Sequence, residues 1–352
     1  MNREDELSLL RGCAEELIPW YRAVRRELPW RRNPTPYQVW ISEIMLQQTR
    51  IEAVIPYYAR FLAELPDVAA LAAVPEDRLL KLWEGLGYYS RARNLKKAAQ
   101  LVMDKFGGEL PRTAAALRTL PGIGDYTAGA IASIACGEPE PAVDGNVLRV
   151  IMRVTACADD VLSQKTKSRV ADALRVIYPS GEDAGLLTEG LMELGETVCL
   201  PNGEPRCGEC PLRELCLARR EGLTAELPRR SPKKERRIEE KTVLLLRSDA
   251  RYALRRREDS GLLAGMWEFP SLPGRLSAES VRAALEERGL SVQDIRPCGD
   301  AKHIFTHVEW RMSGYFVNLS EQSGEYEWKT AAEICADYAI PTALKAYFKL
   351  LK

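Results

Sequence analysis

The sequence predicts an all-α domain followed by a smaller α+β domain. The chain has 352 residues, more than one ordinary compact core accommodates. Up to about residue 218, apolar residues recur at three- and four-residue spacing, as in VWISEIMLQQTRIEAVIPYYARFLAEL. Beyond residue 242, short apolar runs such as TVLLLRS and WRMSGYFVNL are typical of strands. We therefore expect a helical domain over 1–227 and an α+β domain over 242–352.

The two halves are joined by PRRSPKKERRIEEK, residues 228–241, which contains two prolines and almost no apolar side chains. This composition predicts a solvated linker. In the helical half, proline and glycine interrupt the pattern often enough to predict many short helices. In the second half we expect strands at 242–248, 251–257, 265–272 and 310–319, with helices at 277–289 and 341–352.

Charge and hydropathy limit the possible classes of protein. Lys and Arg together number 50, as do Asp and Glu, so the net charge is zero and a nucleic-acid partner would require a local basic surface. The first residues, MNREDELSLLRGCAEELIPWY, interrupt every apolar run with a charge. Such a pattern predicts neither a signal peptide nor a membrane span. We expect a cytosolic protein with no membrane partner.

Four of the nine cysteines form a dense cluster with the spacing Cx7Cx2Cx5C in the loop 199–216. An odd cysteine count in a cytosolic chain argues against a disulfide framework, and this density indicates a metal site. Zinc sites usually pair their ligands in two short knuckles, whereas only one short pair exists here. The spacing therefore favours a [4Fe-4S] cluster, with zinc as the alternative. The four expected ligands are Cys199, Cys207, Cys210 and Cys216.

A Pro-Gly-x-Gly turn lies between two helical patterns in LPGIGDYTAGAIASIA, residues 120–135. Without Cβ atoms at Gly122 and Gly124, a phosphate could approach the backbone N–H groups at the start of the second helix. This would be a contact to DNA that is independent of base sequence. The alternative is an ordinary connection between two helices.

This turn, the following PAVDGNVLRV and the four-cysteine loop together resemble the helix-hairpin-helix DNA glycosylases. LPWRRNPTPYQVWISEIMLQQTRIEAVIPYYARF and GLGYYSRARNL further resemble the adenine DNA glycosylase (MutY) family. The resemblance covers most of residues 7–220. It implies a base excision repair enzyme with a [4Fe-4S] cluster that removes adenine opposite 8-oxoguanine or guanine in double-stranded DNA. We expect it to act as a monomer, and the sequence indicates no particular protein partner.

The resemblance assigns the chemistry to Glu43, as acid, and Asp144, as stabiliser of the oxocarbenium-like sugar. Glu43 shares a helix face with apolar residues, which predicts a raised pKa. Asp144 precedes the periodic run NVLRVIMRV, and this helix N-cap position favours its ionised form. Without the resemblance, both would be read as ordinary structural residues.

Tyr126 and Asn146 complete the catalytic set that the resemblance implies. Relatives that also cut the DNA backbone have a lysine at the position of Tyr126, and a phenol cannot form the Schiff base that this lysine forms. We therefore expect monofunctional hydrolysis. Asn146 is expected to position the acid and base groups.

Further residues are assigned to DNA by the same resemblance. An adenine pocket is expected from Trp30, Arg31 and Glu189, because a carboxylate accepts a hydrogen bond from the exocyclic amine of adenine. Contacts to the duplex near the lesion are expected from Gln48, Thr49, Leu86 and Tyr88, with aromatic and basic residues interleaved after Leu86.

The second domain resembles a Nudix domain that recognises 8-oxoguanine. In RAALEERGL, residues 282–290, Ala283 replaces the usual glutamate and the upstream Gly and Glu spacing is missing, so we expect binding without hydrolysis. The family motif Phe-Ser-His is Phe305, Thr306 and His307 here, and Thr306 keeps the hydroxyl. A second departure is the first gap of the cysteine loop, which has seven residues where the family commonly has six.

Three other functions fit parts of the sequence. A bifunctional glycosylase and AP lyase of the endonuclease III type would share the hairpin and the cluster, but Tyr126 argues against it. A pyrophosphohydrolase acting on free 8-oxo-dGTP is disfavoured by the altered Nudix motif. A non-catalytic DNA-binding iron-sulfur protein would tolerate the loss of Glu43.

Overall fold

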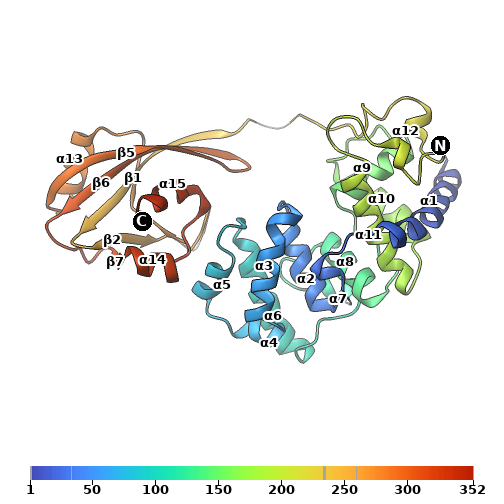
Figure 1. Ribbon diagram of the computed structural model, residues 1–352, viewed down its shortest axis with the longest axis horizontal. Coiled ribbons are helices and arrows are strands. Elements are labelled where there is room, and N and C mark those ends of the chain that lie inside the picture. Colours follow the sequence, from blue (N-terminus) through green and yellow to red (C-terminus); the bar gives the residue numbers. More distant parts are fainter. Residues whose placement is uncertain (1, 33, 233–234, 259, 352) are drawn as a thin grey trace. The chain divides into compact units, whose positions relative to one another are not determined.

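The computed structural model describes residues 2–32, 34–232, 235–258 and 260–351. The chain divides into two compact units (Figure 1). One consists of the described residues of Met1–Ala73 and Asn94–Pro232, and the other of those of Val74–Arg93 and Lys233–Lys352. Among the described residues, no helix is both long and apolar enough to cross a bilayer.

Helices make up the first unit, as the three- and four-residue spacing predicts. They are α1 (Arg3–Val24), η1 (Pro29–Arg31), α2 (Pro36–Leu46), α3 (Ile51–Glu64), α4 (Val68–Ala73), most of α6 (Ser90–Phe106), α7 (Ala114–Leu117), α8 (Asp125–Cys136), α9 (Gly145–Val154), α10 (Gln164–Ile177), α11 (Glu182–Thr197), η2 (Cys207–Glu209) and α12 (Leu217–Arg220). The additional helix α5 (Glu76–Leu82) belongs to the second unit.

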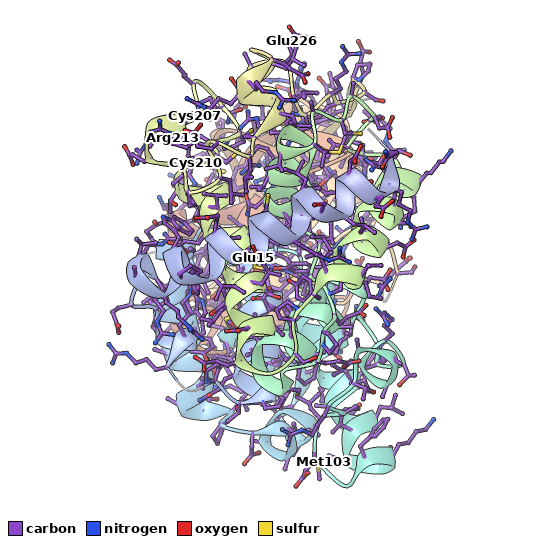
Figure 2. All side chains as sticks on the ribbon, turned by 90° about the vertical axis from the view of Figure 1, so that its right-hand side faces the viewer. Glu15, Met103, Cys207, Cys210, Arg213 and Glu226 are labelled. Carbon is purple, nitrogen blue, oxygen red and sulfur yellow. The ribbon has the colours of Figure 1, made fainter. Side chains whose placement is uncertain are left out.

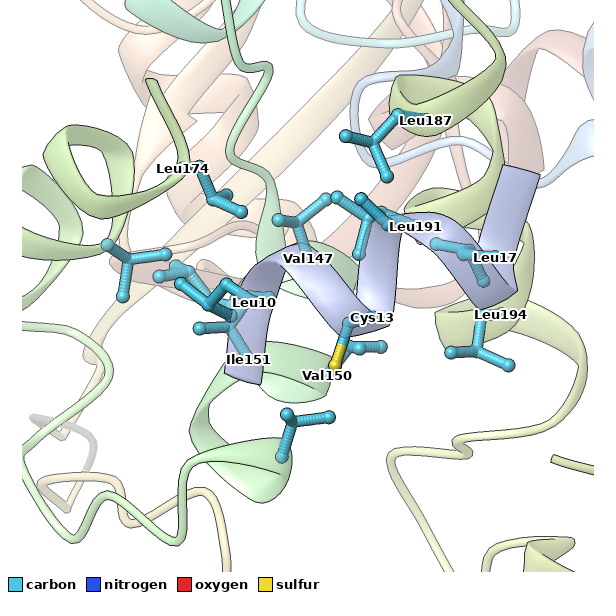
Figure 3. Packing of buried hydrophobic residues seen from close by; sticks show 14 of the residues in the cluster. Leu10, Cys13, Leu17, Val147, Val150, Ile151, Leu174, Leu187, Leu191 and Leu194 are labelled. Carbon is cyan, nitrogen blue, oxygen red and sulfur yellow. The ribbon is translucent and has the colours of Figure 1, made fainter. Parts of the chain in front are cut away.

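A core of the first unit forms where α1 lies across α9 and α11 (Figure 3). Leu10, Cys13 and Leu17 recur along one face of α1 and are buried against apolar residues of the other two helices. The same cluster extends to Leu212 in the cysteine loop. Packing of α1 therefore fixes α9 and α11, the helices that carry Asn146 and Glu189.

Seven strands of the described residues form one sheet in the second unit. They are β1 (Arg237–Ser248), β2 (Arg251–Arg256), β3 (Trp267–Glu268), β4 (Ser271–Pro273), β5 (Val292–Ile304), β6 (Val308–Leu319) and β7 (Glu327–Thr330). The order β3-β2-β1-β6-β5 places β1 parallel to β6, whereas β4 and β7 pair antiparallel with β1 and β2.

The central strand β1 is buried on both faces. Val243 and Leu245 point into one apolar cluster, and Leu244 and Leu246 into another. Helix α13 (Ala278–Glu286), capped by the Ser277 side chain, covers the second face. The run VLLL is thus continuous because both faces of the strand are covered.

Parts of the second unit differ from the sequence prediction. Strand β1 begins at Arg237, inside the stretch 228–241 that we expected to be a linker, because Arg237–Arg247 pairs with β6. Residues 233–234 of that stretch lie outside the described residues. The expected helix at 341–352 is instead three single turns, η3 (Thr342–Leu344), α15 (Lys345–Phe348) and η4 (Lys349–Leu351). Strands β5 and β7 and helix α14 (Ala331–Asp337) were not anticipated.

Candidate active site

Glu43 lies in the interior of the first unit, on helix α2. A capping box between Thr35 and Gln38 starts this helix, which packs against α8. The Glu43 residue is only 6 % exposed, and the Tyr126 hydroxyl on α8 donates a hydrogen bond to its Oε2. The two residues are 83 positions apart in sequence, so the pairing depends on the packing of the two helices.

Burial changes the proton affinity of this pair. Loss of solvent raises the pKa of Glu43 from 4.5 to about 7, while the hydrogen bond from Tyr126 opposes that rise. Burial also raises the pKa of the Tyr126 hydroxyl. Glu43 can therefore hold a proton near neutral pH, as its apolar helix face predicts, and Tyr126 remains a hydrogen-bond donor.

Asp144 is the N-cap of α9, where the sequence places it. Its Oδ1 accepts the backbone N–H of Val147 at 2.7 Å, and its Oδ2 accepts the Asn146 side-chain amide at 2.9 Å. These donors lower the pKa of Asp144, as its N-cap position predicts, but burial has the larger effect. Burial raises the pKa of Asp144 above its usual value, and the hydrogen bonds only limit that rise.

Asn146 is held by groups that the sequence did not single out. Its Oδ1 accepts a hydrogen bond of 2.7 Å from Arg149, whose guanidinium also donates to the carbonyls of Gly195 and Cys199. A Cβ atom at Gly195 would lie 2.6 Å from the Asn146 Cβ, so the close approach of α11 and α9 requires glycine there. These contacts connect the Asp144 cap to the start of the cysteine loop.

The expected adenine-pocket residues lie in the same region. Trp30 is buried and makes an edge contact with Tyr58, with ring centroids 5.5 Å apart. Arg31 Nε lies 3.4 Å from Glu189 Oε1, and both Arg31 and Glu189 act electrostatically on Glu43. The structure thus places Arg31 and Glu189 close enough to Glu43 to change its pKa.

The sequence analysis did not identify the residues that hold Arg31. Glu193 forms ion pairs with both Arg26 and Arg31, and the Arg31 guanidinium carbon lies 5.4 Å from the centre of the Tyr21 ring. A glutamate four residues after Glu189, on the same helix face, was the available signal.

The other DNA candidates of the first unit lie at turns. Gln48, with a φ of 58°, and Thr49 follow the end of α2, and Gln48 is exposed. Gly122 lies between α7 and α8 with a φ of 78°, and an added Cβ would lie 2.7 Å from the Asn94 Cβ. Gly124 is the N-cap of α8, and no atom lies within 4 Å of an added Cβ.

A separate group of candidates lies in the second unit. Phe305, Thr306 and His307 form the tip of the β5–β6 hairpin, closed by a hydrogen bond from Phe305 N–H to the Val308 carbonyl. The exposed Tyr88, at a φ of 47°, has its hydroxyl 3.2 Å from Thr306 Oγ1. All four residues line one cavity of about 1050 Å³.

Leu86 does not share the exposure of Tyr88. It is 7 % exposed, so its side chain packs inside the protein. The backbone of this segment is held by Arg91, which donates to the carbonyls of Leu86 and Gly87. The Arg91 guanidinium also lies over the Tyr88 ring. Arg91 is therefore a structural support for Tyr88.

The four clustered cysteines line one cavity of the first unit, where Cys207, Cys210 and Arg213 lie close together (Figure 2). Arg153 on α9 donates to the Cys199 thiol at 3.2 Å and to the Leu200 carbonyl. Residues 201–204 are exposed, so an additional residue in the first gap can be accommodated at the surface. Among the described side chains, no group of three or more His, Cys, Asp or Glu could hold a single metal ion.

The buried Glu43, the glycine turn before α8 and the capped Asp144 all lie in a region that matches a class of DNA repair proteins. Residues 41–179 match the HhH-GPD superfamily of base excision DNA repair proteins, and residues 242–350 match the NUDIX domain. A solved thermostable thymine-DNA glycosylase is 26 % identical, with a TM-score of 0.55 over 62 % of this chain and 98 % of its own. Endonuclease III in a non-covalent complex with DNA is 27 % identical, with a TM-score of 0.52 over 63 % and 99 %.

The particular family follows from curated relatives. The adenine DNA glycosylase of Homo sapiens is 34 % identical over 98 % of this chain and 74 % of its own length. That of Buchnera aphidicola from Acyrthosiphon pisum is 31 % identical over 86 % and 85 %. The chain belongs to the adenine DNA glycosylase family and is an enzyme of base excision repair.

Replacement of Glu43 by Gln should change how stability depends on pH. A pKa raised from 4.5 to about 7 means that ionised Glu43 costs the folded state roughly 3 kcal/mol above pH 7 and little below pH 4.5. Glu43→Gln should therefore be more stable than the wild type at pH 8, with a gain that shrinks towards pH 5. Denaturant unfolding at both pH values measures this, and an equal difference at the two would contradict a buried, titrating Glu43.

Proposed function

We propose that this enzyme removes adenine paired with 8-oxoguanine or guanine by monofunctional hydrolysis of the N-glycosidic bond. Glu43 acts as the acid and Asp144 as the stabilising anion. The observation that carries the proposal is the buried Glu43 carboxyl, hydrogen-bonded to Tyr126 and in the same region as the capped Asp144. One group is suited to keep its proton and the other to be held as an anion by its donors.

The steps follow from these two groups. Protonated Glu43 transfers its proton to the adenine, and the glycosidic bond breaks with its electron pair leaving on the base. The positive charge that develops on the sugar lies near Asp144, whose carboxylate stabilises it as in O-glycoside hydrolysis. Water adds to the sugar carbon, and its proton returns to the Glu43 carboxylate. Asn146 and Arg149 keep Asp144 in place.

Hydrolysis without strand cleavage is supported by Tyr126. An endonuclease III structure, 27 % identical to this chain, is of a trapped covalent intermediate with DNA. A Schiff-base intermediate of a lyase needs an amine nucleophile, and the Tyr126 phenol instead donates a hydrogen bond to Glu43. Tyr126 is therefore proposed to orient the acid.

Recognition of the opposite base is proposed for the hairpin tip of the second unit. Tyr88 presents an exposed ring to stack on bases, and the adjacent Thr306 hydroxyl can donate or accept a hydrogen bond. The positive φ of Tyr88 and the support from Arg91 hold this ring in an unusual exposed position. We propose that these residues make the enzyme prefer duplexes with 8-oxoguanine opposite adenine over those with guanine.

A [4Fe-4S] cluster is proposed for the cysteine loop, held by Cys199, Cys207, Cys210 and Cys216. All four cysteines line one cavity. Their unequal spacing, with a single short CxxC pair, favours an iron-sulfur cluster over a tetrahedral zinc site. When bound, the cluster would brace the loop against α9.

Activity should depend on the charge and the proton of Glu43. In single-turnover reactions with adenine opposite 8-oxoguanine, guanine or thymine, the wild type should leave alkali-labile sites, with the 8-oxoguanine duplex reacting fastest. Glu43→Gln should slow excision by roughly 10²–10⁴-fold because it cannot donate a carboxyl proton. No alkali-labile product from any duplex would refute the proposal, and strand scission before alkali would favour a lyase.

The lesion preference has its own matched pair of variants in the same assay. Thr306→Ser keeps the hydroxyl and should retain the preference for 8-oxoguanine over guanine. Thr306→Val keeps the shape but loses the hydroxyl, so that preference should fall by about tenfold, the equivalent of one hydrogen bond. Equal preferences in the two variants would exclude Thr306 from lesion recognition.

The purified protein should contain about four iron atoms per chain and absorb in the iron-sulfur charge-transfer region. Cys210→Ser should lose most of this iron because a hydroxyl is a poor ligand for a soft site. Cys335→Ser, which changes an exposed cysteine outside the loop, is the control. Stoichiometric zinc without iron would overturn the assignment.

A further inference from the structure

Arg26, Arg31 and Glu193 form a buried network of ion pairs that the reaction described above does not use. The Glu193 side chain, 2 % exposed on α11, accepts Arg26 Nε at 2.5 Å and Arg26 Nη2 at 3.1 Å. It also accepts Arg31 Nη2 at 2.8 Å. Glu189 lies one turn earlier on the same helix, 3.4 Å from Arg31 Nε. Arg31 thus lies between two carboxylates of one helix face.

The two carboxylates are not equivalent. Glu193 has charge-assisted hydrogen bonds from two guanidinium groups, whereas the Arg31 contact of Glu189 is longer. Burial raises the pKa of Glu189, and the same effect on Glu193 is outweighed by its two arginines, which lower its pKa. Glu193 is therefore the carboxylate that binds the arginine charge, and Glu189 keeps capacity to accept another donor.

Arg31 is also fixed from other directions. Its Nη1 lies 3.4 Å from the Arg26 carbonyl, and its guanidinium carbon lies 5.4 Å from the centre of the Tyr21 ring. Only 10 % of its side chain is exposed. A long cationic side chain normally keeps several rotamers, so a buried anion at Glu193 removes most of that freedom.

We propose that Glu193 is a positioning residue that sets the base specificity of excision. By binding Arg31, it prevents that arginine from pairing fully with Glu189, whose carboxylate then accepts a hydrogen bond from the exocyclic amine of the purine. This inference rests on the proposed excision of adenine and on the adenine pocket that the family resemblance implies for Arg31 and Glu189. It assigns the preference for a 6-aminopurine to a residue that does not touch the base.

The expected effect follows from removing one charge. In Glu193→Gln, Arg31 loses its anionic partner at Glu193 and moves towards Glu189. The Glu189 carboxylate then pairs with Arg31 and cannot accept a hydrogen bond from the exocyclic amine of adenine. The variant should lose the part of its rate that depends on the exocyclic amine. A purine without that amine never used the contact, so its excision should change little.

The test compares two bases in otherwise identical duplexes, adenine and unsubstituted purine opposite 8-oxoguanine, in single-turnover reactions. Glu193→Gln should lower the ratio of the two rate constants by about tenfold, equal to one lost hydrogen bond. Glu193→Asp, which keeps the charge on a shorter side chain, should give an intermediate ratio. Glu196→Gln is the matched control, because Glu196 is 43 % exposed and pairs with Arg26.

The ratio separates positioning from folding. A purely structural role for Glu193 would slow both bases equally and leave the ratio at its wild-type value, which would overturn the proposal. If Glu193→Gln does not fold, an unchanged ratio in Glu193→Asp would overturn it as well. Failure of the wild type to excise adenine would instead refute the proposed function itself.

Discussion

The candidate active site depends on one constraint, which is the burial of ionisable groups in the helical unit. Glu43 is enclosed between α2 and α8, and Asp144 lies at the start of α9. Each buried charge needs a partner, and Tyr126 and Asn146 supply one for each carboxyl. Burial of the ionised Glu43 carboxylate would destabilise the fold, and the same burial keeps Glu43 protonated near neutral pH. The loss of stability and the proposed acid function therefore have the same cause.

Arginines extend this network to the rest of the unit. Arg149 connects Asn146 to the Cys199 carbonyl, and Arg153 connects α9 to the Cys199 thiol. On the other side, Arg31 connects Glu189 to Glu193. Hydrogen bonds therefore tie the cysteine loop to Asp144, whereas Arg31 and Glu189 act on Glu43 electrostatically. The apolar core of α1, α9 and α11 holds the backbones at the spacing that these bonds require.

Local features of the site were predictable from the sequence, and tertiary ones were not. The apolar face of the Glu43 helix and the cap at Asp144 follow from neighbouring residues, as does the continuous apolar run of β1. The ion pairs of Glu193 join residues about 160 positions apart, which no local pattern reveals. Strand β5 escaped prediction because Pro297 and Gly299 interrupt its alternation at an irregular point of the ladder. The burial that raises the pKa of Asp144 depends on the packing around α9, which the sequence does not reveal.

The central claim is that burial keeps Glu43 protonated for catalysis near neutral pH. It is tested most directly by the pH dependence of adenine excision at subsaturating enzyme, which reports the groups of the free enzyme. The rate constant should fall as pH rises through about 7, where Glu43 loses its proton. In the wild type, the hydrogen bond from Tyr126 lowers the pKa of Glu43. Tyr126→Phe removes that bond, so the pKa of Glu43 should rise and the fall in rate should move to higher pH. A rate that is constant from pH 5.5 to 8.5, or a fall centred near pH 4.5, would contradict the claim.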